Sequence, residues 1–270
     1  TRVAASMSAK SLKERIPLAP VPKELQQMVL SFNAMLSRLD DAFVRLSNFS
    51  ADIAHELRTP VSNLMTHTEV VLSRKRNIED YEDNLYSNLD DLKRMSRMID
   101  DMLFLAKSDN GLITHENKPI DLVEVVEKLL EYYRLLADER GIQLKVSGRG
   151  SVRGDVLMLH RAISNLLSNA LRYTSEGKTI SVEILQKEMS VLVVVENHGE
   201  PIAPEHLEKL FDRFYRVDPA RREGSPSNAG LGLSITRSII EAHDGKIWCT
   251  SCDGKTAFHL EFPSVDLEVS

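Results

Sequence analysis

The residues with the clearest potential for chemistry form the run His55-Glu56-Leu57-Arg58-Thr59-Pro60. Near pH 7 a neutral imidazole presents an unprotonated ring nitrogen, which can act as a nucleophile without a strong base. Thr59 lies one helical turn after His55, so its hydroxyl can orient water against a group bound to the ring. Glu56 points about 100° away and must curl back to reach the ring nitrogen that does not attack. The alternative is that His55 and Glu56 are solvated surface residues.

Two asparagines four residues apart offer a second kind of chemistry. Asn165 and Asn169 share one face of a helix, while Leu166, Leu167 and Leu171 would face a sheet. Amide oxygens are hard, neutral ligands. Taken alone, however, paired asparagines are usually surface residues.

A short glycine motif, Gly230-x-Gly232, precedes a further helix. Such glycines let backbone amides at a helix N-terminus approach phosphate groups, although the motif is weak evidence by itself. No lysine follows it at P-loop spacing, which excludes that class of nucleotide site. Residues 217–228 are rich in Pro, Ser, Gly and Arg, a composition typical of a mobile lid, and Arg216 beside them could reach a terminal phosphate.

The elements that must position His55 follow a heptad pattern. Apolar residues recur in steps of four and three over residues 25–57, and His55 falls on the outer face of the coiled coil. A second such pattern over residues 85–106 follows the polar stretch 73–80, which predicts a hairpin turn. Pro60 in mid-helix removes a backbone hydrogen bond and predicts a bend beside His55.

Two amphipathic helices cannot close a core of their own, so the sequence predicts a four-helix bundle built from two copies of the chain. We therefore expect a homodimer. Pro17, Pro20 and Pro22 exclude a continuous helix ahead of the heptads and predict a connector there. The expected division is a linker and coiled coil at 1–46 and a dimerisation domain at 47–112.

After Pro119 the pattern changes to short strands and separate helices. Residues 142–146 are strand-like, residues 155–173 form an amphipathic helix, and residues 179–185 and 191–196 read as paired strands. This predicts an α+β domain at 118–265.

Composition narrows the possible partners. The 270 residues carry a net charge of −6, which argues against nucleic acid, because phosphate backbones select basic surfaces. No apolar run approaches the roughly 18 residues that cross a bilayer.

The two cysteines, Cys249 and Cys252, supply half of a zinc site at most. Ordinary thiols on a strand or turn are the favoured interpretation, with a redox or metal role as the alternative.

The run from His55 to Pro60, preceded by Ser50-Ala-Asp-Ile-Ala, resembles the H box of sensor histidine kinases of two-component systems, of the HisKA type. The resemblance implies that His55 accepts the γ-phosphate of ATP, that Glu56 assists it, and that Thr59 serves the reverse, phosphatase reaction. The N–P bond of a phosphohistidine is labile, so transfer to an aspartate in the receiver domain of a response regulator can run downhill.

Residues 165–174 resemble the N box of the same family, which implies that Asn169 coordinates Mg²⁺ and Asn165 lines the ATP site. Residues 196–201, 211–216 and 228–235 follow in the family's order as first glycine box, F box and second glycine box. The implied fold is a dimeric helical-hairpin domain followed by an α/β-sandwich ATP-binding domain of the GHKL (Bergerat) type. The implied nucleotide-site residues are Asn165, Asn169, Arg172, Tyr173, Asn197, Gly199, Arg216, Gly230, Gly232 and Leu233.

Three residues depart from the family's pattern. Asn197 stands where the first glycine box has an aspartate, and Pro201 replaces a glycine. A neutral amide lacks the charge-assisted gain of a carboxylate that accepts from the adenine amino group, so we expect weaker ATP binding. Asn228 replaces the first glycine of the second box, which narrows the backbone conformations available there.

Residues 21–35 resemble the end of a HAMP relay module, which implies a membrane receptor anchored through transmembrane helices upstream of this chain. The chain would then be the cytoplasmic portion of a bacterial inner-membrane protein. The phrases around His55 and around residues 211–218, with Asn197, are similar to those of the heavy-metal (copper and silver) sensor kinases.

Two other functions stay open from the sequence. One is an ATPase of the gyrase and chaperone type, which hydrolyses ATP to drive a clamp. The other is a dimeric scaffold whose ATP site has decayed. The sequence also leaves open the identity of the regulator, the sensed signal, and whether a chain phosphorylates itself or its partner.

Overall fold

The computed structural model describes residues 15–19, 22–112, 116–217 and 230–264. They fall into two compact units that divide between Asp91 and Leu92. Asn228 and all but the first residue of the expected lid lie outside the described residues. Among the helices of these described ranges, none combines the length and the apolar character needed to cross a bilayer.

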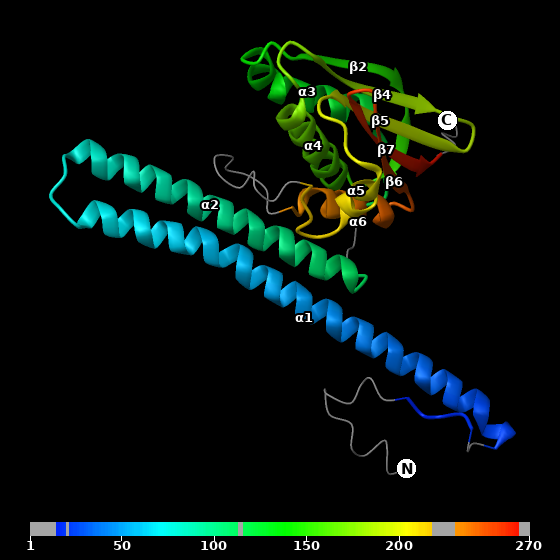
Figure 1. The fold of residues 1–270 in the computed structure, drawn as a ribbon. Coiled ribbons are helices and arrows are strands. Elements are labelled where there is room, and N and C mark those ends of the chain that lie inside the picture. The colour runs from blue at the N-terminus through cyan, green and yellow to red at the C-terminus, as the bar shows by residue number, and fades with distance from the viewer. Residues whose placement is uncertain (1–14, 20–21, 113–115, 218–229, 265–270) are drawn as a thin grey trace. The chain divides into compact units, whose positions relative to one another are not determined.

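Two long helices form the helical hairpin predicted from the heptads (Figure 1). Helix α1 is Lys23–Leu72 and continues through Pro60, and helix α2 is Ile78–Asp109. Asn77 caps α2, because its Oδ1 accepts the backbone N–H of Asp80 at 2.7 Å. The turn between the helices is therefore the predicted polar stretch.

The first part of α2 is tied to α1 by a side-chain hydrogen bond. Asn88 Nδ2 donates to Thr68 Oγ1 at 3.1 Å. Much of the predicted apolar seam nevertheless faces solvent in the single chain: Phe43 on α1 is 49% exposed and Leu85 on α2 is 65% exposed. Such a stripe of large apolar side chains marks a surface that another protein surface can cover.

The second unit contains a two-stranded sheet and a five-stranded sheet. The strands are β1 (Lys118–Asp121), β2 (Gln143–Arg149), β3 (Ser151–Gly154), β4 (Thr179–Gln186), β5 (Ser190–His198), β6 (Lys246–Cys252) and β7 (Lys255–Pro263). The helices that follow α2 are α3 (Leu122–Asp138), α4 (Val156–Tyr173), α5 (Pro204–Leu207), the 3₁₀ helix η1 (Lys209–Phe211) and α6 (Gly232–Ala242). The large sheet has the order β2-β4-β5-β7-β6, with only the β2–β4 pair parallel.

Alternation along the strands explains why one face of the large sheet carries the helices. On β5, Val191, Val193 and Val195 are buried, whereas the residues between them are partly exposed. Helices α3, α4 and α6 pack over that inner face (Figure 1). The result is a two-layer α/β sandwich, which confirms the fold class predicted from the sequence.

Helix α4 is held at both ends. Asp155 caps its N-terminus, with Oδ1 accepting from the backbone N–H of Leu157 at 2.9 Å and of Met158 at 3.1 Å. The backbone N–H of Asp155 in turn donates to His243 Nε2 at 3.0 Å. At the other end, Arg140 donates to the carbonyl of Thr174 at 2.8 Å. These contacts fix the helix that carries Asn165 and Asn169.

Candidate functional site

His55 lies on the solvent-facing side of α1, as the heptad count predicted. Its side chain is 58% exposed, while that of Glu56 is 29% exposed. The Glu56 carboxylate curls back toward the ring, with Oε1 3.9 Å from His55 Nδ1. That separation is too long for a hydrogen bond.

Thr59 is exposed one turn further along the same helix, and the next residue, Pro60, is buried. Because α1 continues through Pro60, His55 and Thr59 stay on one helix with the i, i+4 relation expected of neighbours. The structure thus keeps the predicted spacing of imidazole and hydroxyl.

A cavity of about 310 Å³ in the second unit gathers the predicted nucleotide residues. Helix α4 supplies Asn165, Asn169, Arg172 and Tyr173. The remaining predicted residues that line it are Asn197, Arg216, Gly230, Gly232 and Leu233. Residues from four separate parts of the chain therefore meet around one cavity.

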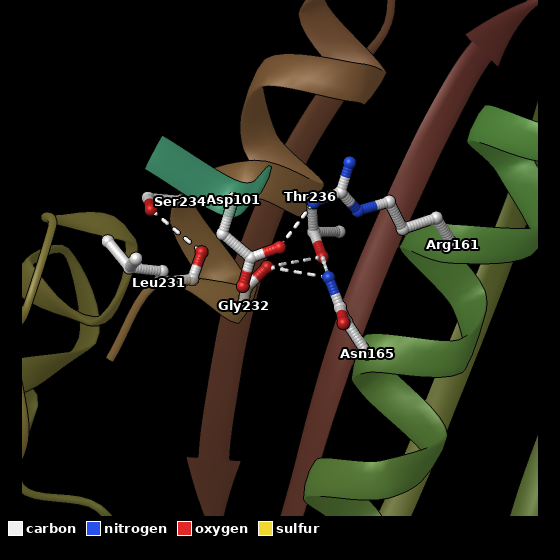
Figure 2. A network of polar contacts seen from close by, with 7 residues as sticks. All are labelled: Asp101, Arg161, Asn165, Leu231, Gly232, Ser234 and Thr236. Atoms are coloured by element: carbon white, nitrogen blue, oxygen red, sulfur yellow. Dashed lines mark hydrogen bonds and ion pairs between the residues drawn. The ribbon is translucent and has the colours of Figure 1, made fainter. Parts of the chain in front are cut away.

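Asn165 also fastens α4 to the beginning of α6 (Figure 2). Its Nδ2 donates to the carbonyl of Gly232 at 3.0 Å and lies 3.5 Å from Thr236 Oγ1. The buried Thr236 hydroxyl donates to that same carbonyl at 2.9 Å. Ser234 Oγ donates to the carbonyl of Leu231 at 2.8 Å in the same turn. The start of α6 is thus held in place without a capping side chain.

One turn before Asn165, Arg161 forms an ion pair with Asp101 from the last part of α2 (Figure 2). The Arg161 guanidinium also lies 4.7 Å from the centre of the Phe104 ring, within the range of a cation–π contact. Burial raises the pKa of Asp101 above its ordinary value, and the nearby Arg161 offsets only part of that rise. A second ion pair joins Arg213 to Asp109 at 2.5 Å.

The F-box turn closes against the glycine motif. The backbone N–H of Phe214 donates to the carbonyl of Gly230 at 3.0 Å. Gly230 has φ +71°, and a Cβ built on it would come within 2.8 Å of the Phe214 backbone. Only glycine combines this left-handed conformation with so close an approach. The same turn places Tyr215 and Arg216 in the cavity wall.

Part of the cavity lining is apolar. Ile202, Leu210 and Phe258 line the cavity together with two buried polar residues, Asn197 at the end of β5 and Thr256 on β7. Asn197 and Thr256 are register partners in the β5–β7 pair. The lining thus combines amides, arginines and one carboxylate, Glu200, with apolar side chains.

Gly199 is the predicted nucleotide residue that does not line the cavity. A Cβ on this residue would lie 2.3 Å from the carbonyl oxygen of Tyr173. Its backbone N–H donates to the carbonyl of Gly254 at 2.9 Å. Because glycine has no side chain, the chain after β5 can pass close to the end of α4.

The donor set suits a metal ion that arrives with a polyphosphate. Among the residues that the structure describes, no three His, Cys, Asp or Glu side chains are grouped to hold a metal by themselves. The amide of Asn169 lines the cavity, and a neutral oxygen ligand fits Mg²⁺ whose charge is already balanced by phosphates. A carboxylate at that position would repel them.

Several lining residues escaped the sequence analysis. Ile202 and Leu210 come from the loop and short helices after β5, and Thr256 and Phe258 come from β7. Tyr215 stood inside the F box but had no assigned role, and its hydroxyl lies 2.5 Å from His206 Nδ1. The alternation of β7 could have indicated which of its residues face inward, although not that they meet a cavity.

The two cysteines differ in solvent exposure. Cys249 is buried on β6, and burial raises the pKa of its thiol to about 12. Cys252 is exposed at the end of the same strand. A protonated, buried thiol is a poor metal ligand or nucleophile at neutral pH, which favours the interpretation as ordinary strand cysteines.

Two family models match the chain. Residues 45–111 match the His Kinase A (phospho-acceptor) domain, and residues 154–266 match the histidine kinase-, DNA gyrase B-, and HSP90-like ATPase. His55 falls in the first match. Every cavity-lining residue falls in the second.

Curated relatives match over nearly the whole chain. Sensor protein CopS of Pseudomonas syringae pv. tomato is 62% identical over 230 residues, which cover 85% of this chain and 47% of the relative. Sensor histidine kinase CusS of Escherichia coli K12 is 51% identical, with 96% and 54% covered, and the probable sensor kinase SilS of Salmonella typhimurium is 45% identical, with 97% and 53% covered. The chain thus spans about half the length of these relatives.

Two solved structures support the fold. The histidine kinase AdeS of Acinetobacter baumannii superposes with a TM-score of 0.64 at 22% identity, covering 78% of this chain and 98% of that one. The histidine kinase ThkA, crystallised in complex with the response regulator protein TrrA, gives a TM-score of 0.66 at 23% identity, covering 83% and 64%. At this identity the likeness concerns the fold alone.

Proposed function

The chain belongs to the sensor histidine kinases of two-component systems, and from that membership we propose that it phosphorylates His55 from ATP and passes the phosphoryl group to an aspartate of a response regulator. The similarity to CopS, CusS and SilS agrees with the heavy-metal subgroup that the sequence predicted. The single observation that carries the proposal is the exposed His55 ring with the Glu56 carboxylate 3.9 Å from Nδ1.

His55 is the proposed nucleophile. Its Nε2 lone pair forms a bond to the γ-phosphorus while the bond from that phosphorus to the bridging oxygen breaks, and ADP leaves. The ring gains positive charge as the N–P bond forms. Glu56 lies beside Nδ1, where its carboxylate stabilises that charge and can take the Nδ1 proton. The product is a phosphoramidate on Nε2.

The cavity is the proposed ATP site. Among its lining residues, Asn165, Asn169, Arg172 and Arg216 would hold the triphosphate, and the apolar side chains would pack against the base. The backbone amides at the start of α6, which Asn165 and Thr236 hold in place, would also face phosphates. When bound, Mg²⁺ would offset the negative charge of the triphosphate, with Asn169 as the protein ligand.

Thr59 is the proposed phosphatase residue. Its hydroxyl lies on the face of α1 that carries His55, where a phosphorylated receiver domain would dock. A Thr59→Ala variant should therefore keep its rate of self-phosphorylation and lose most of its ability to dephosphorylate the regulator. Equal loss of both activities would contradict this assignment.

The partners we propose are a second copy of the chain and a receiver domain. The exposed apolar seam of α1 and α2 has the composition of the core of a four-helix bundle, which two copies would complete. ThkA was crystallised with the response regulator TrrA, and we extend that kind of partner to this chain. We further propose that the intact protein is anchored in the bacterial inner membrane, with this chain as its cytoplasmic portion.

The test is incubation of the purified chain with ATP labelled on the γ-phosphate, followed by acid and alkali treatment of the protein. The proposal predicts a phosphoprotein that is labile in acid and stable in alkali, as expected of an N–P bond. Steady release of phosphate without labelled protein would favour the gyrase-type ATPase. Absence of both labelling and turnover would favour the decayed scaffold.

A further inference from the structure

His206 contacts the wall of the proposed ATP site without lining the cavity itself. It belongs to the short helix α5, and its side chain is 27% exposed. Its Nδ1 lies 2.5 Å from the hydroxyl oxygen of Tyr215, and the centres of the two rings are 6.1 Å apart. Tyr215 lines the cavity. The hydroxyl of Tyr215 is therefore the group through which His206 can act on a bound nucleotide.

This hydrogen bond joins the same two atoms whichever ring nitrogen carries the proton. With the proton on Nε2, Nδ1 accepts from the Tyr215 hydroxyl, and with the proton on Nδ1 the ring donates to the phenol oxygen. In both tautomers the Tyr215 hydroxyl is held to α5. Removal of either the imidazole or the hydroxyl breaks the bond.

Helix α5 is a fixed support for this contact. Two residues before the helix, the backbone N–H of Ile202 donates to Ser251 Oγ on β6 at 2.9 Å. Ser251 Oγ also shares a hydrogen bond of 2.9 Å with Thr256 Oγ1 on β7. Within the helix turn, the backbone N–H of His206 donates to the carbonyl of Ala203 at 2.9 Å. His206 is thus carried by a segment that is tied to the large sheet.

Tyr215 lies in a turn whose backbone conformation is strained. The preceding residue, Phe214, has φ +61°, in the left-handed region that residues with a side chain rarely adopt. Such a conformation persists only where the surrounding contacts hold it. The backbone N–H of Phe214 donates to Gly230, and that of Tyr215 donates to the carbonyl of Asp212 at 3.3 Å. The hydrogen bond to His206 adds a side-chain contact that holds the same turn.

The turn also carries Arg216, which follows Tyr215 directly and lines the cavity. A planar guanidinium binds phosphate through paired N–H donors, so its direction matters as well as its charge. Because the two residues share a backbone, a displacement of Tyr215 also shifts Arg216. The position of the guanidinium therefore depends on the contacts that hold the turn.

We infer that His206 is a positioning residue, which holds the Tyr215 hydroxyl and thereby fixes the F-box turn so that Arg216 binds the terminal phosphate of ATP. This role rests on the proposed kinase function, which makes the cavity the ATP site. In the sequence His206 lies between the first glycine box and the F box, outside both. Its role follows from the contact with Tyr215.

The test uses a matched pair of changes at residue 206. Asparagine and leucine have nearly the same size and shape, but only asparagine keeps a hydrogen-bonding group as far from the backbone as Nδ1. The variants are His206→Asn, His206→Leu, Tyr215→Phe and the double variant His206→Leu, Tyr215→Phe. Isothermal titration calorimetry measures the affinities for ATP and for ADP in the presence of Mg²⁺, and thermal melts control for loss of structure.

His206→Leu and Tyr215→Phe should each weaken ATP binding about fivefold, which corresponds to one lost hydrogen bond. ADP binding should stay within about twofold of the wild type, because ADP lacks the terminal phosphate. His206→Asn should restore ATP binding to within about twofold of the wild type. The double variant should match either single variant, since both single changes break the same bond.

Three results would overturn the positioning role. Equal weakening of ATP and ADP would show that the contact does not act at the terminal phosphate. An additive loss in the double variant would show that the hydroxyl and the imidazole act separately. Equal affinities in His206→Asn and His206→Leu would show that the hydrogen bond is not the cause.

The proposed kinase function fails in a different way. A wild type that binds ATP but forms no labelled protein would contradict that function, and the ATP and ADP affinities would still decide the role of His206. Tyr215→Phe removes a single oxygen atom, so it tests the same hydrogen bond even if a change at residue 206 weakens folding. An ATP affinity in Tyr215→Phe equal to that of the wild type would also contradict the role.

Discussion

At the scale of single residues, the proposed chemistry is divided between an imidazole on α1 and amides that line a cavity in the second unit. His55 needs only exposure and a nearby carboxylate, and it has both. The cavity residues must lie close together, and Asn165 and Asn169 on α4 line the same cavity as Asn197 on β5. All three are neutral amides, so the charged side chains of the cavity lining are Arg172, Arg216 and Glu200.

A residue-scale prediction concerns the strength of ATP binding. Replacement of Asn197 by Asp should tighten ATP binding about fivefold, because a charge-assisted hydrogen bond to the adenine amino group gains about 1 kcal/mol over a neutral one. Isothermal titration calorimetry of wild type and Asn197→Asp measures the difference. An unchanged or weaker affinity would show that the amide is not the cause of weak ATP binding.

At the scale of elements, α4 and α6 together form part of the cavity wall. Asn165 and Thr236 both contact the carbonyl of Gly232, so the spacing between the helices depends on one small polar cluster (Figure 2). His243 at the end of α6 in turn receives the backbone N–H of Asp155, which caps α4. The two helices are therefore tied near both ends.

The polar cluster can be tested through Thr236. Valine has the same shape but no hydroxyl, so Thr236→Val should raise KM for ATP about fivefold, which corresponds to one lost hydrogen bond. Thr236→Ser keeps the hydroxyl and should restore a value near that of the wild type. If serine and valine raise KM equally, packing rather than hydrogen bonding explains the effect. Thermal melts of both variants control for loss of structure.

The cap of α4 gives a prediction with a defined pH dependence. Partial burial of Asp155 raises its pKa, but hydrogen bonds from the backbone N–H groups of Met158, Glu116 and Leu157 outweigh this and lower it below the ordinary value. A lowered pKa in the folded state means that the cap stabilises the fold above pH about 3.9. That stability is lost as the pH falls through the lower folded value.

The variants Asp155→Ala and Asp155→Asn separate the two contributions. Alanine should cost about 1 kcal/mol of unfolding free energy at pH 7, and the gap from wild type should shrink toward pH 3. Asparagine can cap without titrating, so its stability should not show this change. Urea unfolding followed by the fluorescence of Trp248, the single tryptophan of the chain, measures both. A gap for alanine that stays constant with pH would contradict the account.

The elements were predictable where the information is local. The heptads defined the hairpin, and the alternation of apolar residues defined β4 and β5, because period and burial coincide in both. The cavity wall from β7 was not predictable. Thr256 faces Asn197 only because residues 255–263 pair with residues 190–198, a contact between distant segments that no local pattern contains. Gly199 was assigned to the site from the first glycine box, but it does not line the cavity, and its role is to let the chain after β5 pass close to Tyr173.

At the scale of the whole molecule, the exposed seam predicts a dimer. Leu85 and Leu89 on α2 are 65% and 46% exposed in the single chain. A double Leu85→Lys, Leu89→Lys variant should sediment as a monomer, because buried lysines would oppose closure of the bundle. Ser87→Lys, on the opposite face of the same helix, should leave the dimer intact. Analytical ultracentrifugation distinguishes these outcomes, and a dimer that survives the double change would place the interface elsewhere.

The proposed kinase function depends on the imidazole of His55 as the phosphoryl acceptor. The direct measurement is labelling from γ-labelled ATP in wild type, His55→Gln and His67→Gln, where His67 is another exposed histidine three turns along α1. We expect equal acid-labile label in wild type and His67→Gln and no label in His55→Gln. Persistent label in His55→Gln would contradict the assignment of His55 and with it the proposed function.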